Sequence, residues 1–417
     1  MKHLGSLMGL LFVSWALPAG AVTVLEDKEK GVVVNVGVLL QPWLQVTAPG
    51  GGAGEGTCGT ERLSCSPNIG NPDGGPSFDM FMRRARLMLW GNVTKDLAFF
   101  IDTDQSNWGK NGLYNQPMVV QDAFFSYTVM PEFKVDAGLM LVPLSHHTLE
   151  GATSLHALDY HSDLIRFPAG HTFRDVGLQF RGLVAGDKLH YRVGIFNGVR
   201  QAAVPAPPPP DPAVPPPPAN YPVNNLGLPR FSGHLRANIV GVEPDFFFKG
   251  IYFSETPIVS VGVGADFQPN AVLRAFDQRR NYFQGSVDVF AEIPFSADNE
   301  VIVKANLFYA SIGASGVTGP AVNTRPQGAV GAYLEAGYRM GWIEPLAFVE
   351  AYQEPDGEDE PGARSYISPH LGINFWAMKH NFNIKTDLGY RVYQANLDEP
   401  PPAVRDLMWT TQGQVFF

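Results

Sequence analysis

A histidine-rich segment is the part of this sequence whose residue types could do chemistry. The stretch SHHTLEGATSLHALDYHSDLIRFPAGHTF at 145–173 holds five of the ten histidines. Imidazole changes charge between about pH 5 and 8, so the segment could act as a pH-dependent filter. Other readings are a metal site, since His146 and His147 stand near Glu150, and plain backbone hydrogen bonding. Adjacent loop residues rarely bind a metal together without a third ordered ligand, so we expect no metal there. The candidate residues are His146, His147, His156, His161, Arg166 and His171.

Nucleophilic catalysis has little support in the sequence. A serine hydrolase needs a serine, a histidine and an orienting polar group in contact. Ser145 and His146 are neighbours, but adjacent side chains on a strand point apart. Neither Gly-x-Ser-x-Gly nor a glycine-rich phosphate loop occurs. We therefore expect no enzyme and no cofactor.

The two cysteines lie in GTCGTERLSCSP, as Cys58 and Cys65. In an exported protein this spacing predicts a disulfide that closes a small loop. A metal pair is the less favoured reading, because no further ligand stands close by.

The N-terminal sequence predicts export. It reads MKHLGSLMGLLFVSWALPAGAV, with a positive Lys2, an apolar run from Leu4 to Leu17 and a small-x-small signal at Ala19-Gly20-Ala21. The run is too short to span a membrane as a helix. We interpret residues 1–21 as a secretory signal peptide, with an uncleaved anchor as the alternative.

The bulk composition argues for many strands and against nucleic acid. Asp and Glu number 40 against 30 Lys and Arg, an acidic balance that disfavours a nucleic-acid partner. Gly (44) and Pro (35) cluster between segments of alternating apolar and polar residues, as in strands joined by turns.

Period-two alternation predicts sixteen strands, most of them long enough to cross an outer membrane when tilted, which takes about 9–11 residues. In the last strand Leu407, Trp409 and Val415 share one face, and Thr410 and Gln412 share the other. The predicted strands are 32–47, 78–93, 96–105, 117–130, 132–142, 174–184, 188–198, 231–242, 256–267, 281–293, 300–312, 328–340, 343–354, 365–379, 381–395 and 405–417.

The connections between these strands alternate between long and mostly short. Long ones include 48–77 with the cysteine pair, 143–173, 313–327 and 199–230, which is rich in proline. Transmembrane barrels place short turns on the periplasmic side and long loops outside. The exception is 243–255, EPDFFFKGIYFSE, which is longer than a periplasmic turn should be.

Two folds fit this pattern: a soluble barrel or sandwich with its apolar face inside, and a lipid-embedded barrel with that face outside. Chain size, the signal peptide and the sorted loops favour the second. We predict an all-β chain whose residues 22–417 form one transmembrane, antiparallel, up-and-down β-barrel of about 16 strands. Such a barrel encloses more room than side chains fill, so the lumen would hold water.

Several segments resemble the phosphate-selective porin O and P family of Gram-negative outer membranes. They are FDMFMRRARLMLWGNVTKDLAFFIDTD, QDAFFSYTVMPEFKVDAGLMLVPLS and FRDVGLQFRGLVAGDKLHYRVGIFNG, in that order over 78–200. The resemblance implies a trimeric, water-filled barrel with inward-folded loops, and anion passage aided by basic lumen residues. Carried over to this sequence, those residues are Arg84, Arg86, Arg181 and Arg192. The alternative for them is a lumen network paired with acidic residues.

The lumen-facing charges do not favour one sign. Ten basic residues stand against twelve acidic ones on our assignment of faces, so anion or phosphate preference is left open. Pore-lining basic candidates are Arg84, Arg86, Arg181, Arg192, Arg236, Lys304, Arg339, Lys385 and Arg391, and Lys134 completes the ten. Pore-lining acidic candidates are Asp102, Asp104, Asp122, Asp288, Glu292, Glu335 and Glu350, and Asp136, Asp175, Asp266, Glu344 and Asp387 complete the twelve.

We predict an outer-membrane porin for passive diffusion of small hydrophilic solutes, with 143–173 as the constriction loop. A plugged barrel with an adhesive or structural role, and a membrane-bound hydrolase, are the alternatives. The expected partners are outer-membrane lipid, two further copies of the chain, and the barrel-assembly machinery, which would recognise the C-terminal Phe417.

Overall fold

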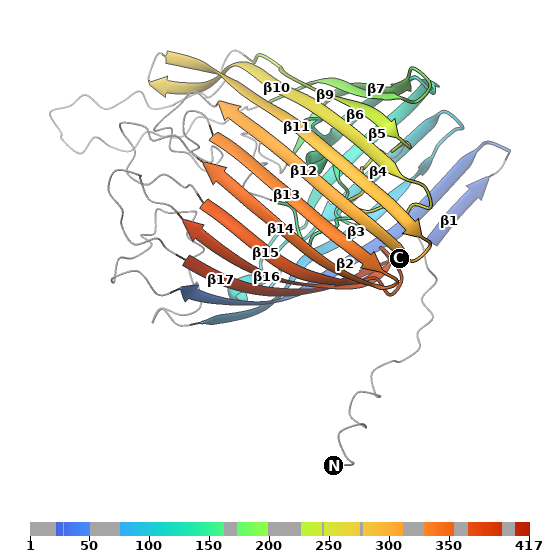
Figure 1. Cartoon of the computed structure of the whole chain (residues 1–417). Coiled ribbons are helices and arrows are strands. Elements are labelled where there is room, and N and C mark those ends of the chain that lie inside the picture. The colour runs from blue at the N-terminus through green and yellow to red at the C-terminus, as the bar shows by residue number, and fades with distance from the viewer. Residues whose placement is uncertain are drawn as a thin grey trace.

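Sixteen antiparallel strands close into a barrel in the computed structural model (Figure 1). The structure describes residues 22–27, 29–50, 76–161, 173–198, 227–243, 246–275, 278–311, 329–353, 366–393 and 405–417. Each strand pairs with its neighbours along the chain, and β17 pairs with β2 to close the ring. The predicted all-β, up-and-down barrel of about 16 strands is confirmed.

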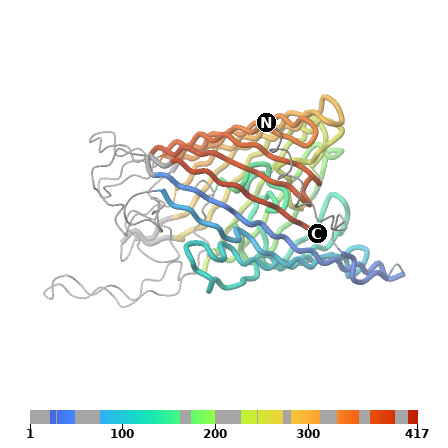
Figure 2. Tube along the Cα trace, turned by 90° about the horizontal axis from the view of Figure 1, so that it is seen from below, coloured from blue at the N-terminus to red at the C-terminus, as the bar shows by residue number. Residues whose placement is uncertain are grey.

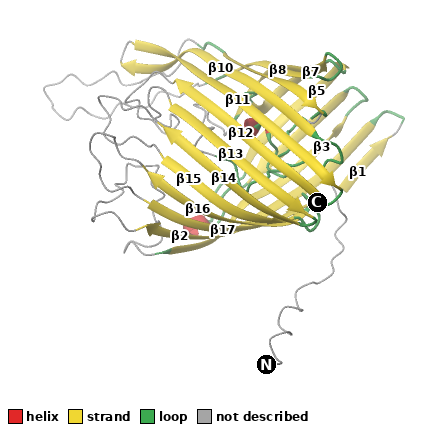
Figure 3. Cartoon of the chain, viewed as in Figure 1, coloured by secondary structure: helices red, strands yellow, loops and turns green. Residues whose placement is uncertain are grey.

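The barrel strands follow the alternating segments of the sequence closely. They are β2 (Val32–Gly50), β3 (Ser77–Asn92), β4 (Leu97–Asp104), β5 (Val119–Met130), β6 (Phe133–Leu141), β7 (Arg174–Val184), β8 (Leu189–Phe196), β9 (Arg230–Val240), β10 (Ile258–Ala275), β11 (Gln278–Ser296), β12 (Asn299–Ser311), β13 (Ala329–Met340), β14 (Ile343–Gln353), β15 (Tyr366–Phe375), β16 (Phe382–Tyr393) and β17 (Arg405–Phe416). Two short 3₁₀ helices, η1 (Lys110–Gly112) and η2 (His147–Leu149), interrupt the loops, and within the described residues no helix is long and apolar enough to span a membrane (Figure 3).

A seventeenth strand, β1 (Val22–Asp27), lies outside the ring and was not predicted. It pairs with Val32–Val36 of β2, whereas β17 pairs with β2 only from Leu39 onward. β1 therefore continues the edge where β17 ends, and the β1–β2 hairpin projects beyond the ring near the C-terminus (Figure 2). Six residues directly after the predicted cleavage site gave too short a pattern to recognise.

The apolar face of the strands points outward and the charged face points inward. Leu334 is 52% exposed and Trp409 is 46% exposed, whereas Lys385 is 2% and Glu350 is 6% exposed. In a soluble barrel or sandwich these values would be reversed. This orientation is that of a barrel with lipid around it and a polar interior.

Charge on the outer face should be costly near the middle of a strand. Leu334→Arg places a guanidinium in the outward band of β13, and we expect the free energy of unfolding from lipid to fall by about 2–4 kcal/mol. Met340→Arg, at the end of the same strand and also exposed, is the control and should cost about 0–1 kcal/mol. Urea titration in liposomes measures both, and equal costs would contradict the outward orientation.

Candidate functional site

A segment that we call the inner loop, residues 142–161, folds into the barrel between β6 and β7. Val142, Leu144, Leu149 and His156 are fully buried, although the segment belongs to no strand. Leu144 and Leu149 pack with Phe248 and with Tyr282 and Tyr333 of the wall. The inner loop therefore occupies part of the lumen, and its apolar side chains are shielded by the wall it lies against.

A second segment enters the barrel from the opposite end. This turn insert, residues 241–257, joins β9 to β10 on the side of the short turns, and is the connection that was too long for a turn. The N–H groups of Gly151 and Phe248 donate to the carbonyls of Phe248 and Leu149, each at 2.9 Å. The insert and the inner loop thus meet inside the lumen.

Aromatic side chains of the turn insert fill the space where the two segments meet. Phe248 is fully buried and stacks on His146, with 4.9 Å between ring centroids. The guanidinium carbon of Arg192 lies 4.7 Å from the Phe248 ring centroid, and that of Arg236 lies 5.3 Å away. Phe246 stacks on Phe124 at 4.4 Å. Cations over ring faces hold an aromatic side chain in place, so the insert is fixed against the basic residues of β8 and β9.

Ion pairs also tie the turn insert to both the wall and the inner loop. Glu243 accepts from Arg236 at 2.6 Å and lies 2.8 Å from the imidazole of His146. Arg236 in turn pairs with Asp288, which lies 2.8 Å from His234. Since all five side chains are buried, each charge depends on its partner for compensation.

The inner loop is joined to the β13–β14 wall by a chain of alternating imidazoles and carboxylates, which we call the latch. His156 lies between Glu344 at 2.6 Å and Glu335 at 2.5 Å. His161 lies between Glu335 at 3.0 Å and Glu350. Two loop side chains thereby bridge three wall carboxylates, which fixes the loop across the lumen.

These contacts change the expected titration of the loop histidines. Burial lowers the pKa of His161, but Glu350 and Glu335 outweigh it and raise the pKa to about 9. His156 is likewise raised to about 9, by Glu344 and Glu335 against its burial. Burial lowers the pKa of His147 to about 4. With these pKa values His156 and His161 stay positive and His147 stays neutral between about pH 5 and 8. A change of pore charge in that range stays a prediction and would have to come from other groups.

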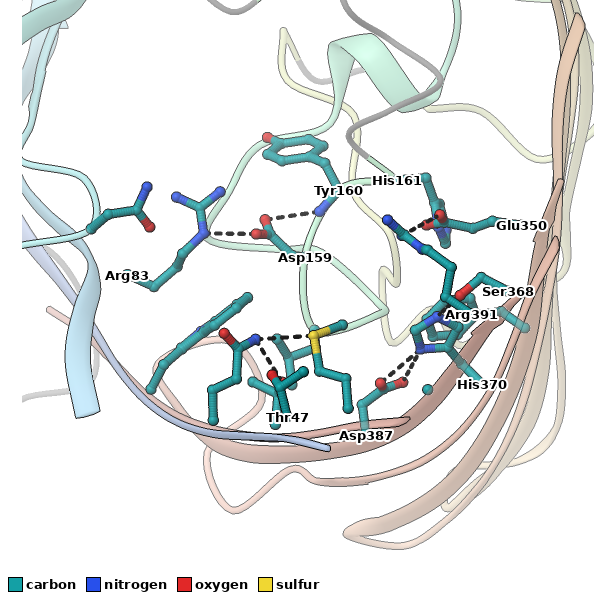
Figure 4. Close-up of a pocket in the computed structure, with 18 of the residues that line it drawn as sticks. Thr47, Arg83, Asp159, Tyr160, His161, Glu350, Ser368, His370, Asp387 and Arg391 are labelled. Atoms are coloured by element: carbon teal, nitrogen blue, oxygen red, sulfur yellow. Dashed lines mark hydrogen bonds and ion pairs between the residues drawn. The ribbon is translucent and has the colours of Figure 1, made fainter. Parts of the chain in front are cut away.

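A cavity of about 460 Å³, the outer cavity, lies in the half of the lumen nearer the long loops (Figure 4). On one side Asp159 of the inner loop accepts from Arg83 at 2.7 Å and also pairs with Arg84. Lys110 lines the cavity as well, with its ammonium 5.1 Å from the ring centroid of Phe81. One carboxylate thus compensates two guanidinium groups, which leaves this side positive.

The opposite side of the outer cavity belongs to the wall. Figure 4 shows Glu350, His370, Asp387 and Arg391 projecting toward the inner loop. Arg391 lies 3.5 Å from Glu350, which also contacts the imidazole of His161. The cavity is therefore lined by charges of both signs on two facing surfaces.

Every described residue among the predicted pore-lining candidates lies on the inner face. Arg391 is the most exposed of the basic ones, with 24% of its side chain accessible. Arg86 pairs with Asp102 at 2.8 Å and Asp104 at 3.0 Å. The other side chains buried inside the barrel are Arg84, Arg181, Arg192, Arg236, Lys304, Arg339, Lys385, Asp122, Asp288, Glu292, Glu335, Glu350, His146, His147, His156 and His161.

Four predicted residues lie outside the described part of the chain: Arg166, His171, Cys58 and Cys65. The pairing of the cysteines accordingly stays a prediction. Within the described residues, no group of His, Cys, Asp and Glu side chains has the arrangement of a metal site.

Arg83 was missed because strict alternation places it on the outer face. The β2–β3 register shifts after Gln41↔Arg84 to Pro42↔Met82, so Arg83 is the extra residue of a bulge. A bulge re-aims a side chain, and here Arg83 and Arg84 both reach Asp159. Glu243 and Asp159 were missed because they belong to connections, where no periodicity marks the inner face.

The comparisons with known proteins agree with this architecture. Residues 69–204 match the phosphate-selective porin O and P family. The resemblance predicted from the motifs is therefore confirmed over the porin-like region, which runs from the residues before β3 to those after β8 and includes the inner loop. None of the curated proteins matches the chain.

Solved structures similar to this chain include an outer membrane channel and an anion-selective porin. An anion-selective porin from Comamonas acidovorans has a TM-score of 0.56 at 12% identity, covering 93% of this chain and 100% of that one. The outer membrane channel DcaP of Acinetobacter baumannii has a TM-score of 0.55 at 13% identity, and the match covers 94% of this chain and 100% of that one. OprB of Pseudomonas putida has a TM-score of 0.55 at 10% identity, and the match covers 92% of this chain and 94% of that one. At these identities the likeness establishes the porin fold.

Proposed function

We propose that the chain is an outer-membrane porin that lets small hydrophilic solutes diffuse passively through its lumen. The observation that carries this proposal is the closed sixteen-stranded ring with apolar side chains outside and charged ones inside. A barrel of that size leaves an aqueous passage unless inserts fill it. The similarity to an anion-selective porin and to DcaP, an outer membrane channel, supports the same function.

We infer that the positive side of the outer cavity attracts small anions. Asp159 is shared by Arg83 and Arg84, and Lys110 adds a further positive charge on the same side. Charged rings in a narrow pore select ions by sign. The positive charge on this side of the cavity therefore attracts anions, and the carboxylates of Glu350 and Asp387 face it from the wall. Competition measurements test whether phosphate is preferred over other anions.

Reconstitution of the purified protein into a planar bilayer tests the proposal. Uniform ohmic steps, with a reversal potential of anion-selective sign across a salt gradient, are expected. Absence of conductance in correctly folded protein would favour the plugged barrel with an adhesive or structural role.

Arg84→Glu should lower the relative anion permeability, because it replaces one of the two guanidinium groups on Asp159 by a second carboxylate. The reversal potential across a salt gradient measures this directly. Lys95→Glu makes the same charge change on a short turn where the side chain is 86% exposed, and it should leave the reversal potential unchanged. Equal shifts in both variants would remove Arg84 from the selective region.

The remaining assignments concern export and assembly. We propose cleavage of residues 1–21 on export, a homotrimer with lipid around it, and recognition of Phe417 by the barrel-assembly machinery. In support, Phe417 exchanges backbone hydrogen bonds with Val38 at 2.6 and 3.1 Å and so ends the closing strand pair. Cross-linking of the purified protein tests the homotrimer. The assembly yield of Phe417→Ala tests the recognition of Phe417.

A further inference from the structure

A serine, a histidine and an aspartate form a hydrogen-bonded row on the wall of the outer cavity (Figure 4). The Ser368 hydroxyl oxygen lies 2.8 Å from Nε2 of His370. Nδ1 of His370 lies 2.8 and 3.2 Å from the two carboxylate oxygens of Asp387. A carboxylate can only accept, so in the neutral ring Nδ1 carries the proton and Nε2 accepts from the Ser368 hydroxyl.

This row differs from the pair examined in the sequence. Ser145 and His146 are consecutive, whereas Ser368 and His370 are two apart on β15 and so share one face. Asp387 comes from the neighbouring strand β16, which could not be known without the register. Serine, base and orienting carboxylate are the three parts that activate a hydroxyl nucleophile.

The imidazole of His370 is held on both faces. Phe348 of β14 stacks on it with 4.2 Å between centroids and 13° between planes. On the other side lies Gly389, the register partner of His370, where an added Cβ would stand 2.2 Å from Cε1 of the ring. Only glycine leaves room for the ring there, so its orientation between Ser368 and Asp387 is fixed.

A positively charged residue lies across from Ser368 on the neighbouring strand. The register pairs Ile367 with Val392 and His370 with Gly389, so Arg391 lies across from Ser368. Its guanidinium carbon is 4.3 Å from the Tyr366 ring centroid, and its side chain keeps the 24% exposure given above. The guanidinium also lies 3.5 Å from Glu350. A cation that reaches the attacked carbonyl stabilises the oxyanion that forms there, and Arg391 is the candidate for that role.

We propose that Ser368, His370 and Asp387 form a hydrolytic site for small, water-soluble carboxylic esters in the lumen of this barrel. The Ser368 oxygen bonds to the carbonyl carbon while its proton moves to Nε2 of His370. The bond to the alcohol oxygen then breaks, and His370 returns the proton to that oxygen. Water, deprotonated by His370, cleaves the acyl-serine ester and releases the acid, which restores the serine hydroxyl.

The size and lining of the cavity define the substrate class. A volume of about 460 Å³ accommodates a small ester. Trp43 and Phe348 offer apolar faces, and Arg83 and Lys110 offer positive charge across the cavity. Esters with a short acyl or aromatic group, neutral or carrying one negative charge, fit this lining, whereas a long acyl chain would meet charged walls.

The test uses the full-length protein in detergent, with p-nitrophenyl acetate as substrate and diisopropyl fluorophosphate as covalent probe. We expect hydrolysis above the buffer rate, and a phosphoryl adduct on the Ser368 peptide, in which the serine oxygen displaces fluoride. Ser368→Ala should return the rate to that of buffer. Ser286→Ala is the control. Ser286 is also buried in the lumen, where it donates to the carbonyl of Leu144, and this variant should hydrolyse p-nitrophenyl acetate at the unmodified rate.

Asp387→Asn tests the orienting role separately from folding. It should lower the rate and change its pH profile, because Asn can present its amide N–H to Nδ1 and favour the wrong tautomer. The adduct measurement on unmodified protein requires no variant, so a folding defect cannot mask the outcome. Two results would overturn the proposal. One is hydrolysis no faster than in buffer alone, and the other is an adduct on another residue with none on Ser368. Conductance is measured on the same samples, so loss of the hydrolytic site and loss of the channel are distinguishable.

Discussion

Replacing residues 242–256 of the turn insert by Asn-Gly is expected to raise the single-channel conductance severalfold. The insert places the fully buried Phe248 inside the barrel and joins the inner loop by three backbone hydrogen bonds of 2.9 Å. Two-residue Asn-Gly turns connect antiparallel strands without entering the interior. Removal should therefore widen the narrowest part of the lumen, where resistance to ion flow is greatest.

The chain offers a matched control at the same end of the barrel. The β7–β8 turn at Ala185, Gly186 and Asp187 is exposed and can be replaced by Asn-Gly in the same way. We expect no change in conductance from that replacement. If the insert deletion leaves conductance at its original value while the barrel still folds, the two inserted segments do not form the constriction.

Removing the insert also removes Glu243, which compensates Arg236 and His146. In an open lumen these groups would be hydrated, so the cost of leaving them unpaired is smaller than in a dry interior. The deletion should consequently lower stability less than Glu243→Ala in the intact barrel, where the insert still excludes water. Urea unfolding of the two variants provides the comparison.

The wall of the barrel could be predicted from the sequence, because a strand buries alternate residues and lipid penalises any charge on the wrong face. The sixteen predicted segments correspond to β2 through β17, and residues such as Leu334 and Lys385 lie on the expected sides. Strands β10 and β11 run further toward the long loops than predicted, where Asn270 and Arg279 had been assigned to a connection. Hydrogen bonding to the neighbouring strand extends the sheet through these residues, and local alternation does not reveal it.

The contents of the lumen could not be predicted in the same way. Period-two alternation says which face of a strand is inside, but not which connection turns inward to meet it. The connection 243–255 was noted for its length alone. Its three adjacent aromatic residues, Phe246, Phe247 and Phe248, are the signal that could have shown that this segment needs a partner surface. Contacts such as Asp159 with Arg84, or His370 with Asp387, depend on register and on the path of a loop, which local sequence does not specify.

Glu335→Gln is expected to destabilise the protein by about 3–5 kcal/mol, the usual cost of removing one partner from a buried ion pair. Glu335 contacts His156 at 2.5 Å, His161 at 3.0 Å and Lys304 at 3.4 Å. An amide would leave three buried cations with one carboxylate fewer. Urea unfolding in lipid measures the loss, and Glu132→Gln, on an exposed turn, should show none.

The same latch predicts an alkaline dependence of conductance. His156 and His161 have pKa values raised to about 9 in the folded protein, against about 6.5 when unfolded. A raised pKa means that their stabilising contribution is complete below about pH 6.5 and is lost as pH rises through about 9. Deprotonation removes the positive charges that bind Glu335, Glu344 and Glu350, so the contacts of the latch between the inner loop and the β13–β14 wall should weaken above about pH 9.

We therefore expect conductance to be steady at neutral pH and to become larger and noisier near pH 10, reversibly, in planar bilayers. In the double variant His156→Gln and His161→Gln the charges are absent at every pH, so its conductance should be high and noisy already at neutral pH and should change little on going to pH 10. Arg391 and Lys304 keep their charge over most of this range, which separates the effect from a general loss of lumen charge. A double variant that retained the full alkaline response would place the responsible groups elsewhere in the barrel.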